Sequence, residues 1–295
     1  MYTSCTLCPR NCRVDRTSKQ SGFCGMGDLI QVARASLHMW EEPCISHKNG
    51  SGTIFFAGCN MGCVFCQNYE VSHRAYGAEV SDIQLMRTFD KLIEKGVHNI
   101  NLVTPSHYVP QLAKVLREYK SPVPIIYNSS GYEKAETLRM LEGLIDIYLP
   151  DIKYFDSAPA LKYSGASDYF DYASSAVLEM YRQVGDIVLD ENGIAKKGII
   201  IRHLVLPGNI SQGVKVFEWV RDNLGAETYI SVMRQYTPFG KATEMPPVNR
   251  RLSSREYAIV KQKILAMGFE NCYFQSSESA KESFIPNFNL EGVDL

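Results

Sequence analysis

Short apolar segments alternate with amphipathic segments six times between about residue 50 and residue 267. The apolar segments are rich in β-branched residues, as buried strands are, and the segments between them carry apolar residues at helical spacing. Such alternation predicts a parallel sheet with right-handed crossovers. Six units, fewer than a closed barrel needs, predict an α/β fold that is a partial (β/α)6 TIM-like barrel. The predicted strands are 52–58, 99–104, 124–129, 145–150, 198–206 and 228–236.

Helical patterns fill the gaps between these strands. Ser81 is placed to cap the first predicted helix, and Ser253 and Glu256 have the spacing of a capping box before the last one. The segment 154–197 is longer than the other connections. The predicted helices are 82–95, 110–119, 133–143, 171–184, 212–224 and 254–267.

The composition is that of an ordinary globular protein, with 45% hydrophobic and 21% charged residues in a chain of 295. A net charge of −1 gives no reason to expect nucleic-acid or membrane partners. No apolar run reaches the roughly 20 residues of a membrane span, and the polar, cysteine-rich N-terminus is unlike a signal peptide. We therefore expect a cytoplasmic protein with no nucleic-acid partner and no membrane partner.

Cysteines are numerous and unevenly placed. Eight of the nine lie within the first 66 residues, and Cys272 is the ninth. Disulfides suit small secreted domains, whereas this is a large chain without a secretion signal. Clustered thiols in a reducing compartment indicate metal binding instead.

Three of these cysteines, Cys59, Cys63 and Cys66, follow the first predicted strand with the spacing C-x3-C-x2-C. Thiolates are the natural ligands of iron–sulfur clusters, and three of them leave one iron of a four-iron cluster open to a substrate or cofactor. The alternatives are a three-thiol zinc site completed by His73 or water, and three inert buried thiols. Their position at the carboxyl end of a barrel strand, where such folds carry their chemistry, favours the cluster.

Two glycines and an aromatic residue accompany these cysteines. Gly58 and Gly62 allow the backbone to turn tightly around a bulky cluster. Phe65, directly before Cys66, is placed to shield the cluster from water.

Four more cysteines near the N-terminus form a complete tetrahedral set, and structural zinc, a rubredoxin-like iron or a second iron–sulfur cluster would each suit them. They are Cys5, Cys8, Cys12 and Cys24. We predict a metal-binding module at 1–48 and the barrel with a C-terminal extension at 49–295. The stretch 34–43 is interpreted as a link in which His38 and Glu41 pack rather than line a pocket. Cys44 and Cys272 are predicted to be ordinary buried cysteines.

The stretch CNMGCVFC resembles, at every defined position, the signature of the radical S-adenosylmethionine (SAM) superfamily, C-x3-C-x-aromatic-C. The resemblance covers about residues 50 to 275. A closer similarity, to the subfamily related to pyruvate formate-lyase activating enzymes, rests on CTLCPRNCRVDR, HMWEEPCIS, GSGTIFFAGCNMGCVFCQNYEVS, LVTPSHY and DIKY.

This resemblance implies a partial barrel of the radical SAM type and two cofactors. A [4Fe–4S] cluster would be held by Cys59, Cys63 and Cys66, and the amino and carboxylate groups of SAM would chelate its fourth iron. The reduced cluster would pass one electron to the sulfonium, and the resulting 5′-deoxyadenosyl radical would abstract a hydrogen atom from the substrate. The protein would position and shield these groups.

The resemblance also implies SAM contacts at the strand ends. VTPSHY stands where many superfamily members have Gly-Gly-Glu, and YNSSGY where activating enzymes have Asp-Thr. Asp151 and Lys153 resemble the Asp-x-Lys motif of those enzymes, whose charges suit the ammonium and carboxylate of SAM. Arg202 lies within an apolar strand, so we expect it to point into a polar cavity. The predicted SAM-binding residues are Thr104, Pro105, Ser106, Asn128, Ser129, Asp151, Lys153, Arg202, Gln235 and Tyr236.

Three functions follow from these features. The first is a radical SAM enzyme of the activating type, which forms a glycyl radical on a partner protein. The second is a radical SAM enzyme that modifies a small molecule or peptide. The third is a non-catalytic zinc protein. For either enzyme we expect a low-potential electron donor, such as flavodoxin or ferredoxin, and a protein or small molecule as substrate.

Overall fold

Six parallel strands stand where the sequence predicts them, in a computed structural model that describes residues 2–18, 20–276 and 286–295. They are β2 (Ser51–Phe56), β4 (Ile100–Val103), β5 (Ile125–Ser129), β6 (Ile147–Pro150), β8 (Ala195–Leu204) and β9 (Tyr229–Met233). They pair in this order, and β10 (Cys272–Phe274) adds a further parallel pairing to β9. The sheet order ends at β10 and at β3 (Ala78–Val80), and no pairing joins these two edges among the described residues. The predicted partial barrel is therefore confirmed.

The N-terminal part of the chain contributes its own strand to this sheet. β1 (Ile30–His38) pairs antiparallel with β2 on one side and with β3 on the other. The interpretation of 34–43 as a link overlooks this strand. The register shifts between Val32 and Arg34, so apolar residues do not alternate strictly and the pattern of a strand is hidden.

The six predicted helices are present, and both capping boxes form as predicted at Ser81 and Ser253. These helices are α3 (Asp82–Ile93), α4 (Val109–Glu118), α5 (Ala135–Leu138) with the 3-10 turn Arg139–Leu141, α7 (Tyr169–Val184), α8 (Gly213–Leu224) and α9 (Ser254–Leu265). Short elements that the sequence analysis did not predict are α1 (Pro43–Ser46), α2 (Tyr69–His73), α6 (Ser157–Ser164), β7 (Val188–Leu189), which pairs with β8, and 3-10 turns at Arg16–Ser18, Ser106–Tyr108, Pro207–Asn209 and Gly240–Glu244. No helix within the described ranges is long and apolar enough to cross a membrane.

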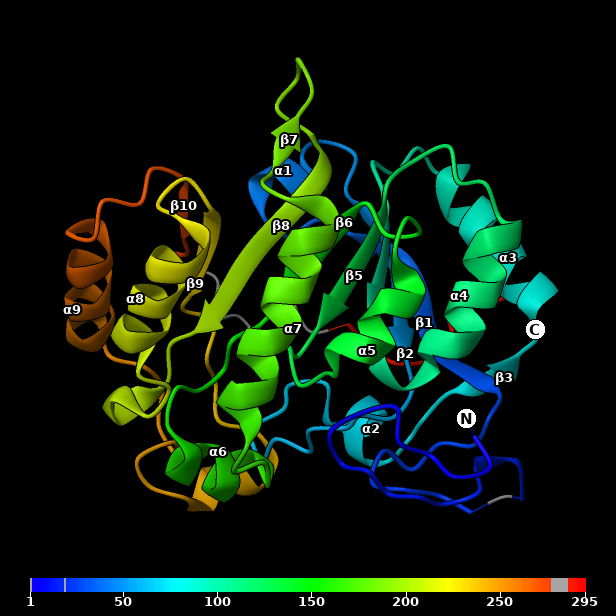
Figure 1. The fold of residues 1–295 in the computed structure, drawn as a ribbon, viewed down its shortest axis with the longest axis horizontal. Helices are drawn as coiled ribbons and strands as arrows, with labels where there is room; N and C mark the ends of the chain where they lie inside the picture. Colours follow the sequence, from blue (N-terminus) through cyan, green and yellow to red (C-terminus); the bar gives the residue numbers. More distant parts are fainter. Residues whose placement is uncertain (1, 19, 277–285) are drawn as a thin grey trace.

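The main hydrophobic core lies between the helices and the sheet. In Figure 1, α5 and α7 lie in front of the strands, with α8 and α9 on one side and α3 and α4 on the other. α7 packs on β6 and β8 through small and flexible apolar residues, among them the fully buried Ala173, Val177 and Met180. Close helix–sheet packing of this kind holds the strand ends in fixed positions.

The two ends of the barrel carry different parts of the chain. α2 and the cysteine-rich N-terminal segment lie at the edge where the carboxyl ends of the parallel strands meet, whereas α1 and β7 lie at the opposite edge (Figure 1). Functional groups of such folds gather at the carboxyl ends of the strands. We therefore expect the functional site at this edge of the sheet.

Candidate functional site

The segment between β2 and α2, residues 57–68, carries Cys59, Cys63 and Cys66 and is called the cysteine loop below. Gly58 and Gly62 have φ angles of 84° and 65°, so both predicted turns require the conformation that glycine adopts most easily. A Cβ on Gly58 would lie 2.6 Å from the carbonyl oxygen of Cys24. The loop is thus packed directly against the N-terminal segment.

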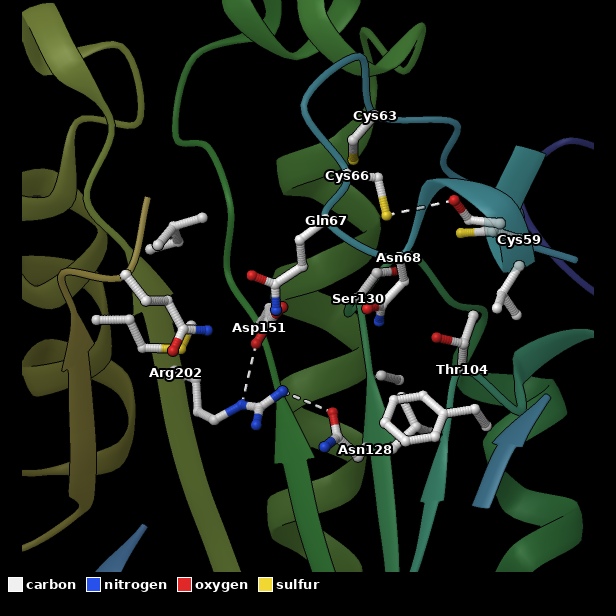
Figure 2. Close-up of a pocket in the computed structure, with 18 of the residues that line it drawn as sticks. Cys59, Cys63, Cys66, Gln67, Asn68, Thr104, Asn128, Ser130, Asp151 and Arg202 are labelled. Carbon is white, nitrogen blue, oxygen red and sulfur yellow. Dashed lines mark hydrogen bonds and ion pairs between the residues drawn. The ribbon is translucent and has the colours of Figure 1, made fainter. Parts of the chain in front are cut away.

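Each of the three sulfur atoms in the cysteine loop accepts a hydrogen bond. The donors are Ser164 Oγ to Cys63 Sγ (3.0 Å), Ser72 Oγ to Cys66 Sγ (3.3 Å) and the Met61 N–H to Cys59 Sγ (3.4 Å). Figure 2 marks the bond at Cys66. Hydrogen bonds to sulfur favour the thiolate form that binds iron, and they tune the potential of a cluster.

Burial disfavours the charged form of these thiols when no cation is bound. It raises the pKa of Cys63 to about 12 and also raises the pKa of Cys66. A bound metal supplies the positive charge that releases such protons. The donor set therefore fits an iron–sulfur cluster.

A single zinc ion suits this geometry less well. His73, named as a fourth ligand only in the zinc alternative, stacks on Tyr69 with ring centroids 4.2 Å apart. In the part of the chain that the structure describes, no three His, Cys, Asp or Glu side chains are grouped so that they could hold one metal ion. A zinc site completed by His73 or water therefore stays an alternative hypothesis for this loop.

A cavity of about 300 Å³ lies between the cysteine loop and the strands. The loop and α2 contribute Gln67, Asn68 and Ser72 in addition to the three cysteines. The opposite wall is built by residues from β5, β6, β8 and β9 and the segments that follow them, as Figure 2 shows for Asn128, Asp151 and Arg202. The sulfur atoms and these polar groups therefore line the same cavity.

Arg202, on β8, connects the charged groups of this cavity. Its Nε donates to Asp151 Oδ1 at 3.0 Å and its Nη2 to Asn128 Oδ1 at 2.6 Å, as Figure 2 shows. Its Nη1 donates to Glu41 Oε2 at 3.1 Å. The other oxygen of Asp151 accepts from Lys153 Nζ at 2.5 Å. The four charged side chains are between 11% and 17% exposed, so they are paired inside the barrel rather than solvated.

The charges of this network stabilise one another against the cost of burial. Burial opposes the charged form of Asp151, but Lys153 and Arg202 outweigh it and lower the pKa of this carboxyl. Burial also opposes the charge of Lys153, and Asp151 raises its pKa above the ordinary value. The pKa of Glu42 moves in the opposite direction to that of Asp151. Burial raises it, and the nearby Arg202 only partly offsets the effect of burial.

Eight of the ten predicted SAM-binding residues line the cavity: Thr104, Asn128, Ser129, Asp151, Lys153, Arg202, Gln235 and Tyr236. Pro105 and Ser106 do not, because Thr104 adopts a φ of 60° and the chain then turns into the 3-10 segment that begins at Ser106. Gln235 accepts a hydrogen bond from Gln275, and the hydroxyl of Tyr236 donates to the Val248 carbonyl at 2.5 Å. SAM binding by these residues stays a prediction.

Several residues of the cavity escaped the sequence analysis. His38 and Glu41, interpreted there as packing, both line the cavity, and Glu41 pairs with Arg202. Glu42 lines the cavity as well. They come from the segment after β1, so no strand-end argument could find them. The signal that was available is the buried charge of Arg202, which requires a carboxylate partner. Gln67 and Asn68 could have been found as polar residues directly after Cys66.

The four N-terminal cysteines lie near one another. Burial, with a smaller contribution from the neighbouring thiols of Cys24, Cys12 and Cys5, raises the pKa of Cys8 to about 12. Phe23 N–H donates to Cys12 Sγ at 3.2 Å. Among the described residues, these four sulfurs are not grouped closely enough to hold one metal ion. A second metal site therefore stays a prediction. Cys44 is buried as predicted, whereas Cys272 is partly exposed.

Known proteins share parts of this chain. Residues 53–190 match the family model described as Radical SAM superfamily. The uncharacterized protein MJ0674 of Methanocaldococcus jannaschii is 29% identical over 265 residues, which are 87% of this chain and 72% of that protein.

Solved structures share the fold at low sequence identity. SuiB of Streptococcus suis superposes with a TM-score of 0.52 and 14% identity, covering 75% of this chain and 47% of SuiB. HydG, described as a maturase of the [FeFe]-hydrogenase, superposes with a TM-score of 0.51 and 12% identity, covering 79% of this chain and 53% of HydG. The chain spans about half the length of these two proteins. The sequence match and the observed barrel together show that residues 53–190 of this chain are a radical SAM superfamily domain.

Proposed function

We propose that this chain is a radical SAM enzyme that removes a hydrogen atom from its substrate, and that a backbone glycine of a partner protein is that substrate. The family implies a [4Fe–4S] cluster and SAM, which together supply a 5′-deoxyadenosyl radical when bound. One observation carries the proposal. The three hydrogen-bonded sulfurs of the cysteine loop face the same cavity as the buried charges of Asp151, Lys153 and Arg202.

The residues of the cavity suit these two groups. The cysteine loop would hold the cluster through Cys59, Cys63 and Cys66. The ammonium of Lys153 suits the carboxylate of SAM, and the carboxylate of Asp151 suits its amino group. Thr104, Asn128, Ser129, Gln235 and Tyr236 would complete the SAM contacts from the surrounding strands.

Phe65 would exclude water from the cysteine loop. Its ring packs edge-on against Tyr236 and Tyr154, with centroids 5.7 Å and 6.5 Å away. The side chain is 7% exposed, so it forms an apolar wall beside the sulfurs. Exclusion of water protects a reactive radical from side reactions.

The experiment that tests the proposed chemistry is anaerobic reconstitution with iron and sulfide, reduction, and electron paramagnetic resonance (EPR) with and without SAM. We expect a reduced-cluster signal that shifts with SAM, and loss of that signal in a Cys59→Ala, Cys63→Ala, Cys66→Ala variant. Cys272→Ala, at the partly exposed cysteine far along the chain, is the control. A colourless wild-type protein without SAM cleavage would contradict the proposal.

The glycine substrate is supported by the similarity of CTLCPRNCRVDR and DIKY to proteins related to pyruvate formate-lyase activating enzymes. Reduced enzyme, a low-potential flavodoxin or ferredoxin, SAM and a candidate partner should give a doublet glycyl radical signal by EPR. Cleavage of SAM without that signal would argue against a glycine substrate.

A small molecule or peptide is the second candidate substrate, and the floor of the cavity favours it. Glu41 and Arg202 lie inside the barrel and offer both signs of charge to a small polar ligand. Transfer of deuterium from a labelled metabolite into 5′-deoxyadenosine would support this candidate. Absence of such transfer, together with a glycyl radical on a protein, would exclude it.

A further inference from the structure

One side chain of the N-terminal segment reaches the cysteine loop. Arg10 lies between Cys8 and Cys12, and its guanidinium donates only to backbone carbonyls among the contacts of the described residues. Nε donates to Asn60 O at 2.8 Å, and Nη2 donates to Met61 O at 3.0 Å and to Ser164 O at 2.9 Å. Nη1 donates to Gly165 O. A single planar group thus joins two segments that lie about a hundred residues apart in sequence.

The residues that Arg10 holds are the same residues that hold the sulfurs. Met61 accepts from Arg10 through its carbonyl and donates its N–H to Cys59 Sγ. Ser164 accepts from Arg10 through its carbonyl and donates its hydroxyl to Cys63 Sγ. Arg10 is therefore connected to two of the three sulfur atoms through one intervening residue each, Met61 in the loop and Ser164 outside it.

Arg10 is itself held in place. Its guanidinium lies 3.8 Å from the centre of the Phe23 ring and 5.2 Å from that of Tyr132. Phe23 also packs against the cysteine loop, since a Cβ on Gly62 would lie 3.0 Å from its ring. A planar guanidinium between rings and carbonyls loses little further freedom when the loop binds a ligand.

The turn that presents Arg10 is docked on the barrel independently of the loop. Asn11 N–H donates to Cys8 O at 3.1 Å, and Lys134 Nζ donates to Asn11 Oδ1 at 2.7 Å. Thr137 Oγ1 donates to Leu7 O at 2.8 Å. The cysteine-rich segment therefore has a fixed base from which Arg10 reaches the loop.

We propose that Arg10 is a positioning residue through which the N-terminal four-cysteine segment holds the cysteine loop in the shape that binds the cluster. This inference rests on the proposed function only in taking the loop as the cluster site. Groups that must meet a ligand in one geometry bind it better when their loop is already ordered. The N-terminal segment would thus serve the barrel site even if it carries out no redox chemistry.

Hydrogen exchange measured by mass spectrometry tests this on the full-length protein, in wild type, Arg10→Gln, Arg10→Lys and Arg13→Gln. Arg13 is an exposed arginine of the same segment and serves as the control. In Arg10→Gln, peptides spanning 57–66 and 160–166 should exchange about tenfold faster or more, since a single charge-assisted hydrogen bond corresponds to about that factor. Peptides of β5 and β6 should keep their protection. Arg10→Lys should resemble Arg10→Gln, because an ammonium cannot contact four carbonyls at once.

Redox titration of the reconstituted cluster gives a second measurement, which separates positioning from charge. The midpoint potential should shift in Arg10→Lys as well as in Arg10→Gln, because both lose the contacts to the loop although Arg10→Lys keeps the positive charge, and an unchanged potential in Arg10→Lys would argue against positioning. Unchanged exchange in Arg10→Gln, or faster exchange spread evenly over the whole chain, would overturn the proposal. If wild type bound no cluster, the proposed function would fail, yet the exchange comparison would still decide the role of Arg10.

Discussion

The guanidinium of Arg202 lies 3.0 Å from the carboxylate of Asp151, and the two residues also form a parallel backbone bridge between neighbouring strands. The same guanidinium reaches Glu41, which follows β1 in sequence. Arg202 therefore ties the segment after the antiparallel edge strand to the carboxyl end of β6. Removal of one member of a buried charge network leaves the charges that it paired with only partly compensated.

Replacement of Arg202 by methionine should lower the free energy of unfolding by about 3–5 kcal/mol, because Glu41 would stay buried without a counter-charge and Asp151 would keep only Lys153. Urea unfolding followed by circular dichroism measures this change. Arg221→Met, at an arginine whose side chain is 39% exposed and pairs with Asp222, should change the free energy of unfolding by less than about 1 kcal/mol. Equal effects of the two substitutions would contradict a structural role for the network.

Glu42 should make the wild-type protein less stable as the pH rises. Its Oε2 is buried with no hydrogen-bond partner among the described residues, and burial raises its pKa in the folded state. Because its pKa is higher in the folded state, Glu42 contributes its full share to the free energy of unfolding below the unfolded pKa of about 4.3. This contribution is lost as the pH rises through the pKa of the folded state. Glu42→Gln should therefore unfold with a larger free energy than wild type at pH 7, and this advantage should shrink toward pH 4. Exposed Glu118→Gln should show no such trend.

Ser164 should raise the potential of a cluster bound at the cysteine loop. Its hydroxyl donates to Cys63 Sγ at 3.0 Å, and such a bond stabilises the more negative, reduced state. Ser164→Ala should shift the midpoint potential by about 20–60 mV to more negative values, the equivalent of one hydrogen bond. Redox titration followed by EPR measures the shift, with exposed Ser175→Ala on α7 as control. A shift in the opposite direction would show that the hydroxyl does not donate to the sulfur.

Gly58 should be required for the shape of the cysteine loop. A side chain there would adopt a left-handed conformation at a cost of about 1–2 kcal/mol, and its Cβ would lie 2.5 Å from Met26 Cγ. Gly58→Ala should therefore bind less iron per chain after reconstitution. Gly96→Ala is the matched control, because Gly96 has a similar φ of 79° and no atom within 4 Å of the added Cβ. Equal iron content in the two variants would refute the requirement.

The N-terminal cysteines should bind metal independently of the cysteine loop. Elemental analysis of the Cys59→Ala, Cys63→Ala, Cys66→Ala variant should still find about one zinc or iron site per chain. An additional Cys8→Ser substitution should remove that metal, because a four-thiolate site loses a ligand. Metal-free protein in the first variant would contradict the predicted second site.

Local sequence was sufficient for the parallel barrel and for the cysteine loop. The strands and helices of the barrel are continuous segments with clear periodicity, and Cys59, Cys63 and Cys66 lie within eight residues of one another. β1 was not predictable in this way, because its register shift hides the alternation on which strand prediction depends. β10 and α2 are too short to show a period at all.

The sequence by itself determined the order of strands and helices, the conformation of Gly58 and the identity of the cysteine loop, because each depends on neighbouring residues. Only the tertiary structure decided which side chains share the cavity. Glu41 meets Arg202, and Arg10 meets Met61 and Ser164, across separations of 161, 51 and 154 residues. Contacts of this range are set by the packing of whole elements, so no local pattern encodes them.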